Sequence, residues 1–188
     1  MAKDIDLLYI YDADMDWATR SSNRHDADMV VGIKGGIKGL KDTFEKFLSD
    51  GLTFRRVTFE THGNEGAIFF GDEKYNRQID AKVLKSSFTG YDALFPEYAK
   101  LMFSGCNVAD GAAGWPFLET AAQVFLTRSG GKTAGWTSVG FAWGANLPGI
   151  LGGVIYDHIY AGHVWHPWGD LHTVWMGPGG SPILHYTN

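Results

Sequence analysis

The fold is decided by a short stretch near the middle of the chain, 101-LMFSGC-106. Residues 101–103 are wholly apolar, as expected of a central strand that is covered on both faces, and Ser104-Gly105 ends the run. Cys106 therefore follows the exit of the predicted strand. In open α/β sheets, ligands bind outside the carboxyl ends of the strands. This placement predicts that Cys106 lies on a functional edge.

An earlier strand ends in a comparable way. Val57 and Phe59 predict a strand over 56–61 that runs into His62-Gly63. An imidazole near a thiol lowers the thiol pKa and donates a proton to the leaving group, and glycine N–H groups are free to stabilise an oxyanion. His62 and Cys106 are thus a candidate base and nucleophile. The alternative is a buried structural cysteine with a histidine in a local hydrogen bond.

Strand and helix patterns alternate along residues 5 to 138. In the first helix pattern, apolar residues recur three and four positions apart from Ile37, and Asp50-Gly51 ends it. The alternation predicts an α/β fold, a three-layer α/β/α sandwich with a mostly parallel central sheet. The predicted strands are 5–11, 56–61, 67–70, 101–103 and 132–138; the predicted helices are 37–48, 79–84 and 115–126, the last beginning at Trp115-Pro116, and 12–34 is a predicted loop.

The composition changes after residue 138, where glycine, tryptophan and histidine become frequent. We therefore divide the chain into a core, residues 1–138, and a C-terminal extension packed on it, residues 139–188. Histidines and carboxylates in the extension have the chemistry of zinc ligands, but their spacing matches no known motif, so we predict aromatic packing, no metal site and no cofactor. The residues concerned are His158, His163, His166, His172, Asp157 and Asp170.

Charge and hydropathy exclude several classes of partner. The net charge of −5 provides no basic surface for a phosphate backbone, so we predict no nucleic-acid binding. The longest apolar glycine-rich stretch, 147–155, is well short of the ~20 residues that a membrane-spanning helix needs. Cys106 is the only cysteine and no signal peptide is evident, which predicts a cytoplasmic protein, or one secreted without a recognisable signal peptide.

Two blocks of sequence point to a family. Residues 57–66, VTFETHGNEG, and 101–111, LMFSGCNVADG, resemble the His-Gly and Gly-Cys blocks of the caspase-like (clan CD) cysteine peptidases. They look closest to bacterial caspase-like domains that carry a Gly-Cys-Asn-Val-Ala-x-Gly sequence. Histidine precedes cysteine in this group, whereas papain-like and cell-wall amidase folds place cysteine first. The resemblance extends over residues 5–138 in element order, and over the two blocks in residue detail.

The resemblance implies roles for individual residues. It makes His62 and Cys106 a catalytic dyad and places the N–H of Gly63 in the oxyanion hole. The family also binds the substrate side chain with residues of the loop after the first strand. Candidates here are Arg20 and Arg24 for an acidic side chain, or Asp12, Asp14 and Asp16 for a basic one. Caspases proper have Gln-Ala-Cys-Arg-Gly around the nucleophile, so caspase specificity is not expected here.

The sequence thus predicts a cysteine-dependent hydrolase, a thiol peptidase that cuts protein or peptide substrates through a thioester intermediate. Two alternatives stay open. The chain could be a catalytically inactive caspase-like module that binds a partner through its aromatic extension, or a bacterial toxin or effector hydrolase.

Overall fold

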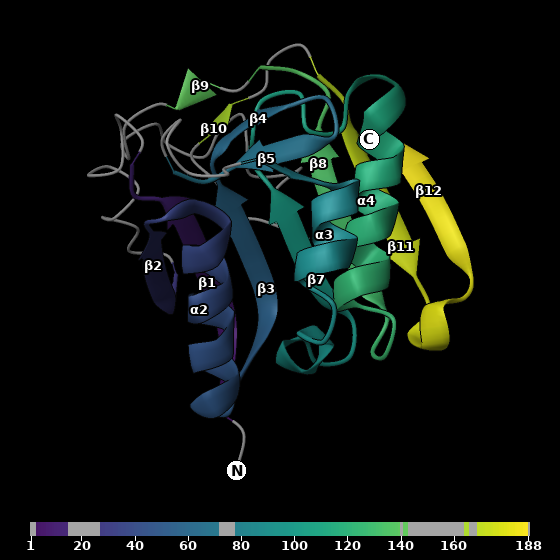
Figure 1. Cartoon of the computed structure of the whole chain (residues 1–188). Helices are drawn as coiled ribbons and strands as arrows, with labels where there is room; N and C mark the ends of the chain where they lie inside the picture. The colour runs from purple at the N-terminus through teal and green to yellow at the C-terminus, as the bar shows by residue number, and fades with distance from the viewer. Residues whose placement is uncertain are drawn as a thin grey trace.

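The computed structural model describes residues 3–14, 27–71, 78–139, 141–142, 164–165 and 169–187. They form a mixed α/β fold around a 7-stranded sheet with the order β12-β11-β8-β7-β3-β1-β2 (Figure 1). Strands β2, β1, β3, β7 and β8 are parallel, and β11 and β12 are antiparallel, which confirms the mostly parallel central sheet. The strands are β1 (Lys3–Asp12), β2 (Met29–Ile33), β3 (Leu52–Glu60), β7 (Ala99–Phe103), β8 (Gly131–Trp136), β11 (Leu171–Met176) and β12 (Ile183–Thr187).

The longer helices cover one face of this sheet (Figure 1). They are α2 (Gly36–Ser49), α3 (Ala81–Ser87) and α4 (Gly111–Phe125), with short 3₁₀ turns η1 (Asp92–Leu94) and η2 (Pro178–Gly180). Their apolar sides meet the sheet in an aromatic core. Phe44 of α2, 1% exposed, packs edge-on against Phe88, Tyr91, Phe95 and Phe125. The helix pattern that begins at Ile37 is confirmed by α2.

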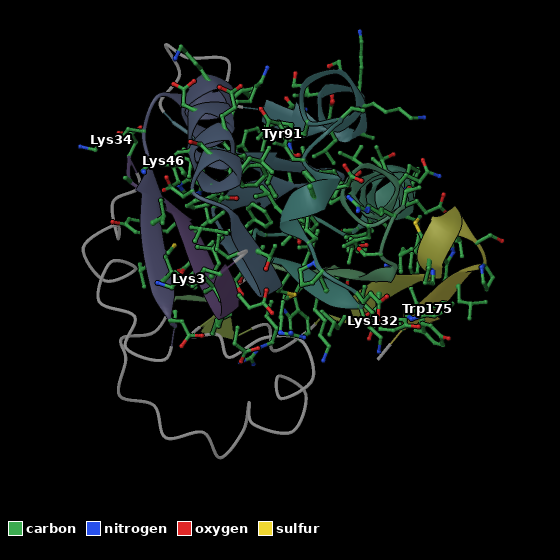
Figure 2. The ribbon with its side chains drawn as sticks, turned by 90° about the horizontal axis from the view of Figure 1, so that it is seen from below. Lys3, Lys34, Lys46, Tyr91, Lys132 and Trp175 are labelled. Carbon is green, nitrogen blue, oxygen red and sulfur yellow. The ribbon has the colours of Figure 1, made fainter. Side chains whose placement is uncertain are left out.

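The opposite face carries a second, smaller cluster of Tyr9, Met102, Ala134, Trp136 and Leu171. No residue of a described helix belongs to this cluster. Figure 2 shows Tyr91 on the side of the helices, and Lys132 and Trp175, which pair across β8 and β11, on the other side of the sheet. A helical layer on this second face, and with it the three-layer sandwich, stays a prediction.

The predicted loop over 12–34 is wrong in part, because it contains β2. This edge strand is 5 residues long and pairs with β1, with Val30 opposite Tyr9. Gly32 interrupts its apolar residues, and a Cβ there would lie 2.6 Å from the Tyr11 ring. So short a run does not establish a strand period, and its pairing with β1 is a tertiary effect that the local pattern does not contain.

Two helix starts also differ from expectation. α4 begins at Gly111 rather than at Trp115, with Asp110 at the N-cap position and Gly111 in a left-handed conformation (φ 61°), so Pro116 lies inside the helix. Ile79 belongs to strand β6 (Gln78–Asp80) rather than to α3. The Asp80 side chain accepts a hydrogen bond from Val83 N at 2.9 Å and begins α3 there.

The C-terminal part of the chain contributes to the main sheet. β11 pairs with β8, with Leu171 opposite Trp136, and β12 then pairs with β11. A separate two-stranded sheet joins β9 (Phe141–Ala142) to β10 (Val164–Trp165). The division at residue 138 therefore stays a prediction, while the described strands after it extend the same sheet. None of the helices in the described part is long and apolar enough to cross a membrane.

Truncation of Phe44 tests the packing of the aromatic core. Phe44→Ala should lower the free energy of unfolding by about 3–5 kcal/mol, because it empties a site surrounded by rings. Leu48→Ala on the same helix is the control, since Leu48 is 37% exposed and its truncation leaves little cavity. Urea denaturation of both variants measures the difference, and equal losses would contradict this description of the core.

Candidate active site

The sheet register brings the two sequence blocks to the same edge. β3 and β7 are parallel neighbours with Phe59 opposite Phe103, and Ser104 N donates to Phe59 O at 2.8 Å just beyond the pairing. The chain after β3 turns into β4 (His62–Asn64), which pairs with β5 (Ala67–Phe69) in a small hairpin sheet with β6. The chain after β7 turns into the segment that carries Cys106. Both blocks thus leave the carboxyl ends of adjacent strands, as predicted.

The two glycines of these blocks touch. A Cβ atom built on Gly63 would lie 2.9 Å from the carbonyl oxygen of Cys106 and 2.6 Å from Val108 Cγ2. A Cβ built on Gly105 would lie 3.0 Å from Gly63 Cα and 3.2 Å from Gly63 N. Only residues without side chains allow the two backbones this close. Each glycine is the chain neighbour of a predicted dyad residue.

This contact sets the surroundings of the predicted dyad. His62 is exposed at the start of β4, and Cys106 is half-buried in the turn after β7. The thiol is therefore not enclosed in the hydrophobic core, where a structural cysteine would lie. The two residues lie at the rim of the sheet, each next in the chain to one glycine of the Gly63–Gly105 contact.

The turn that carries Cys106 is fixed by backbone hydrogen bonds. Asn107 N donates to Ser138 O at 2.9 Å, and Ala109 N donates to Trp136 O at 3.0 Å. On the other side, Gly66 N of the β4–β5 hairpin donates to Val108 O at 3.0 Å. Asn107 itself is left-handed (φ 55°), a conformation that asparagine tolerates better than most residues. The turn is held between the exit of β8 and the hairpin that begins with His62.

Asp12 lies at the end of β1, buried at 2% exposure. Its carboxylate oxygens accept hydrogen bonds from Asp14 N at 3.0 Å and Gly71 N at 3.1 Å. Burial raises the pKa of Asp12, while these two hydrogen bonds and the charge of His62 act in the opposite direction. Asp12 is therefore tied to two loops beside His62. Its predicted role in substrate binding stays a prediction.

The other predicted substrate-binding residues, Arg20 and Arg24, lie outside the described residues, as does Asp16. The same holds for His158, His163, His166 and Asp157 of the extension. Within the part of the chain that the structure describes, no group of histidine, cysteine and acidic side chains could hold a metal ion. His172 lies there in a stack with Trp115.

Sequence reasoning missed Glu60 and Ser104, which lie beside the site. Glu60 ends β3 two residues before His62 and is 5% exposed; Ser104 follows β7 two residues before Cys106 and is 3% exposed. The strand register places them next to each other, on the sheet face opposite the helices. The Ser104 hydroxyl has no hydrogen-bond partner among the residues that the structure describes, and burial raises the pKa of Glu60 from 4.5 to about 7. The available signal was a glutamate directly after the uncharged residues 57–59 of the strand.

No family model matches the chain, and no match was found among curated proteins or among solved structures. The resemblance of the two blocks to caspase-like peptidases therefore rests on their residues and order alone.

Gly63→Ala tests the contact between the blocks. The added methyl would overlap the Cys106 carbonyl oxygen and Val108, so the free energy of unfolding should fall by about 1–3 kcal/mol. Gly135→Ala in β8 is the matched control, because the nearest heavy atom to its added methyl is 3.4 Å away. Urea denaturation compares the two. A Gly63→Ala protein as stable as the Gly135→Ala protein would show that the backbones are not in contact.

Glu60→Gln tests the buried carboxyl group. The folded protein binds the Glu60 proton more tightly than the unfolded chain does. This difference in proton binding stabilises the folded state below pH 4.5, and the stabilisation is lost as pH rises toward about 7. The amide removes this loss, so the variant should be more stable than the wild type at pH 8 by up to about 3 kcal/mol, and not at pH 4.5. Urea denaturation at both pH values measures this, with exposed Glu97→Gln as the control. A gain that is the same at both pH values would contradict it.

Proposed function

We propose that this chain is a cysteine-dependent hydrolase, a peptidase of the caspase-like type with His62 and Cys106 as its dyad. The proposal rests on the backbone contact between Gly63 and Gly105 at one edge of the sheet. His62 and Cys106 are the chain neighbours of these two glycines. The exposure of His62 and the half-exposure of Cys106 support it, since a substrate must reach both. The residues of the two blocks and their order add the family resemblance.

In the proposed reaction, His62 takes the thiol proton and the Cys106 thiolate attacks the carbonyl carbon of the scissile amide. The oxygen of the tetrahedral intermediate accepts a hydrogen bond from the N–H of Gly63, whose nitrogen adjoins the cysteine block. Collapse of the intermediate breaks the C–N bond, and the imidazolium gives its proton to the leaving amine. Water, deprotonated by His62, then hydrolyses the thioester and restores the thiol.

Cleavage of a peptide library tests the reaction. Cys106→Ala should abolish cleavage while the thermal unfolding midpoint changes little, since a thiol-to-methyl change at a half-buried position is small. Products formed by the wild type and absent with the variant define the substrate sequence. Cleavage that persists in a folded Cys106→Ala protein would reject the assignment.

The alkylation rate of Cys106 tests the dyad without a substrate. A histidine-activated thiolate reacts rapidly with iodoacetamide near neutral pH, so His62→Ala should slow the reaction by about fivefold or more. Mass spectrometry follows the modified protein over time. Equal rates for the wild type and His62→Ala would mean that the imidazole does not activate the thiol.

A binding module is the second candidate, and one observation favours it. Strand β12 forms an edge of the sheet and carries Leu184 and Tyr186, which are 42% and 47% exposed. Apolar side chains on an open strand edge suit association with another protein. Slow alkylation of wild-type Cys106, with no library cleavage, would favour this candidate over the hydrolase.

A further inference from the structure

Three aromatic rings stack between α4 and the C-terminal strands. Trp115 of α4 lies over His172 of β11 with ring centroids 4.2 Å apart and an interplanar angle of 11°. It also stacks with His185 of β12 at 4.6 Å and 14°. His185 Nε2 lies 2.7 Å from Glu119 Oε1, one helical turn along α4 from Trp115. The stack therefore fixes the plane of the His172 ring from the helix side.

The His172 ring also makes a hydrogen bond outside the stack. Its Nδ1 lies 3.0 Å from Ala109 O. Because a carbonyl oxygen only accepts, the ring must donate, and the proton is on Nδ1. Ala109 belongs to the same turn as Cys106. The bond therefore connects strand β11, which lies between β12 and β8, to the segment that carries the proposed nucleophile.

Ala109 lies next to the pair of strands that carries His172. Gly135 pairs with His172 across β8 and β11, and a Cβ on Gly135 would lie 3.4 Å from the Ala109 methyl. Both backbone polar groups of Ala109 are thus bound to the sheet, its N–H by Trp136 O and its carbonyl by His172. Gly66 binds the neighbouring Val108 carbonyl from the other side.

From this geometry we infer that His172 is a positioning residue for Cys106. It acts through the Ala109 carbonyl and holds the turn at the distance from the His62 hairpin that the dyad requires. The inference rests on the proposed function, because it assigns His172 to that reaction. His172 itself touches neither substrate nor the reacting atoms. The stack on Trp115 supplies the rigidity that makes its hydrogen bond directional.

Two substitutions separate the hydrogen bond from the stack. His172→Phe keeps a ring to pack on Trp115 and removes the donor. His172→Asn removes the ring and keeps an N–H donor near the place of Nδ1. His185→Asn is the control, because it removes the second histidine ring that stacks on Trp115 and leaves the hydrogen bond between His172 and Ala109 intact. Each protein is assayed for iodoacetamide alkylation of Cys106 at pH 7, and for hydrogen exchange in the peptide spanning the turn.

We expect the hydrogen-bond donor at position 172, and not the ring, to determine both the alkylation rate and the hydrogen exchange. His172→Phe should slow alkylation about fivefold and speed exchange of the turn amides, while His172→Asn and His185→Asn stay within about twofold of the wild type in alkylation. Equal behaviour of His172→Phe and His172→Asn, or a turn whose exchange is unchanged by losing the donor, would overturn the inference. If His172→Phe does not fold, a slowed His172→Asn protein overturns it and an unchanged one supports it.

Failure of the proposed function would look different. In that case wild-type Cys106 reacts no faster than free cysteine and His62→Ala does not change its rate, whatever His172 does. Hydrogen exchange still reports whether His172 orders the turn. If the turn loosens in His172→Phe but the wild-type thiol shows no activated alkylation, the dyad is rejected, and with it the role of His172 in positioning Cys106 for the reaction.

Discussion

The close approach of two backbones at the edge of the sheet is the constraint on which the site depends. Gly63 and Gly105 have no side chains, and each occupies a place where a methyl group would overlap the other block or Val108. The approach is possible because β3 and β7 are adjacent and parallel, so that their chains leave the sheet at one edge. Glycine is thus required by the meeting of two segments that are distant in sequence, and not by a local turn.

The rest of the fold supplies a rigid base for this contact. The aromatic core around Phe44 fixes the helices on one face. The stacked rings of Phe59 and Phe103, with centroids 5.1 Å apart, pack together near the carboxyl ends of β3 and β7, next to the site. Positions held by packed strands are more accurate than positions on free loops. The turn with Cys106 is held as firmly as a strand only because β8, β11 and the β4–β5 hairpin all form hydrogen bonds with its backbone.

Much of this arrangement was predictable from the sequence because it depends on strong local patterns. The apolar run before Cys106, the helix pattern from Ile37 and the glycines at the strand exits each indicate their element and its end. β2 was missed because an edge strand of 5 residues has too few positions to show a period. β11 and the hydrogen bond of its His172 were missed because their partners, β8 and Ala109, are remote in the chain. Pairing of that kind is set by tertiary structure, which no local window contains.

The two buried carboxyl groups beside the site, Asp12 and Glu60, differ in the interactions that set their pKa values. Asp12 accepts two backbone N–H groups and lies near His62, and all three interactions favour its charged form against the cost of burial. Glu60 is buried where the strand register brings it next to Ser104, and burial raises its pKa to about 7. Near neutral pH a good part of Glu60 is therefore uncharged. Asp12 interacts electrostatically with His62, so in the proposed reaction an ionised Asp12 would stabilise the positive charge on the imidazole.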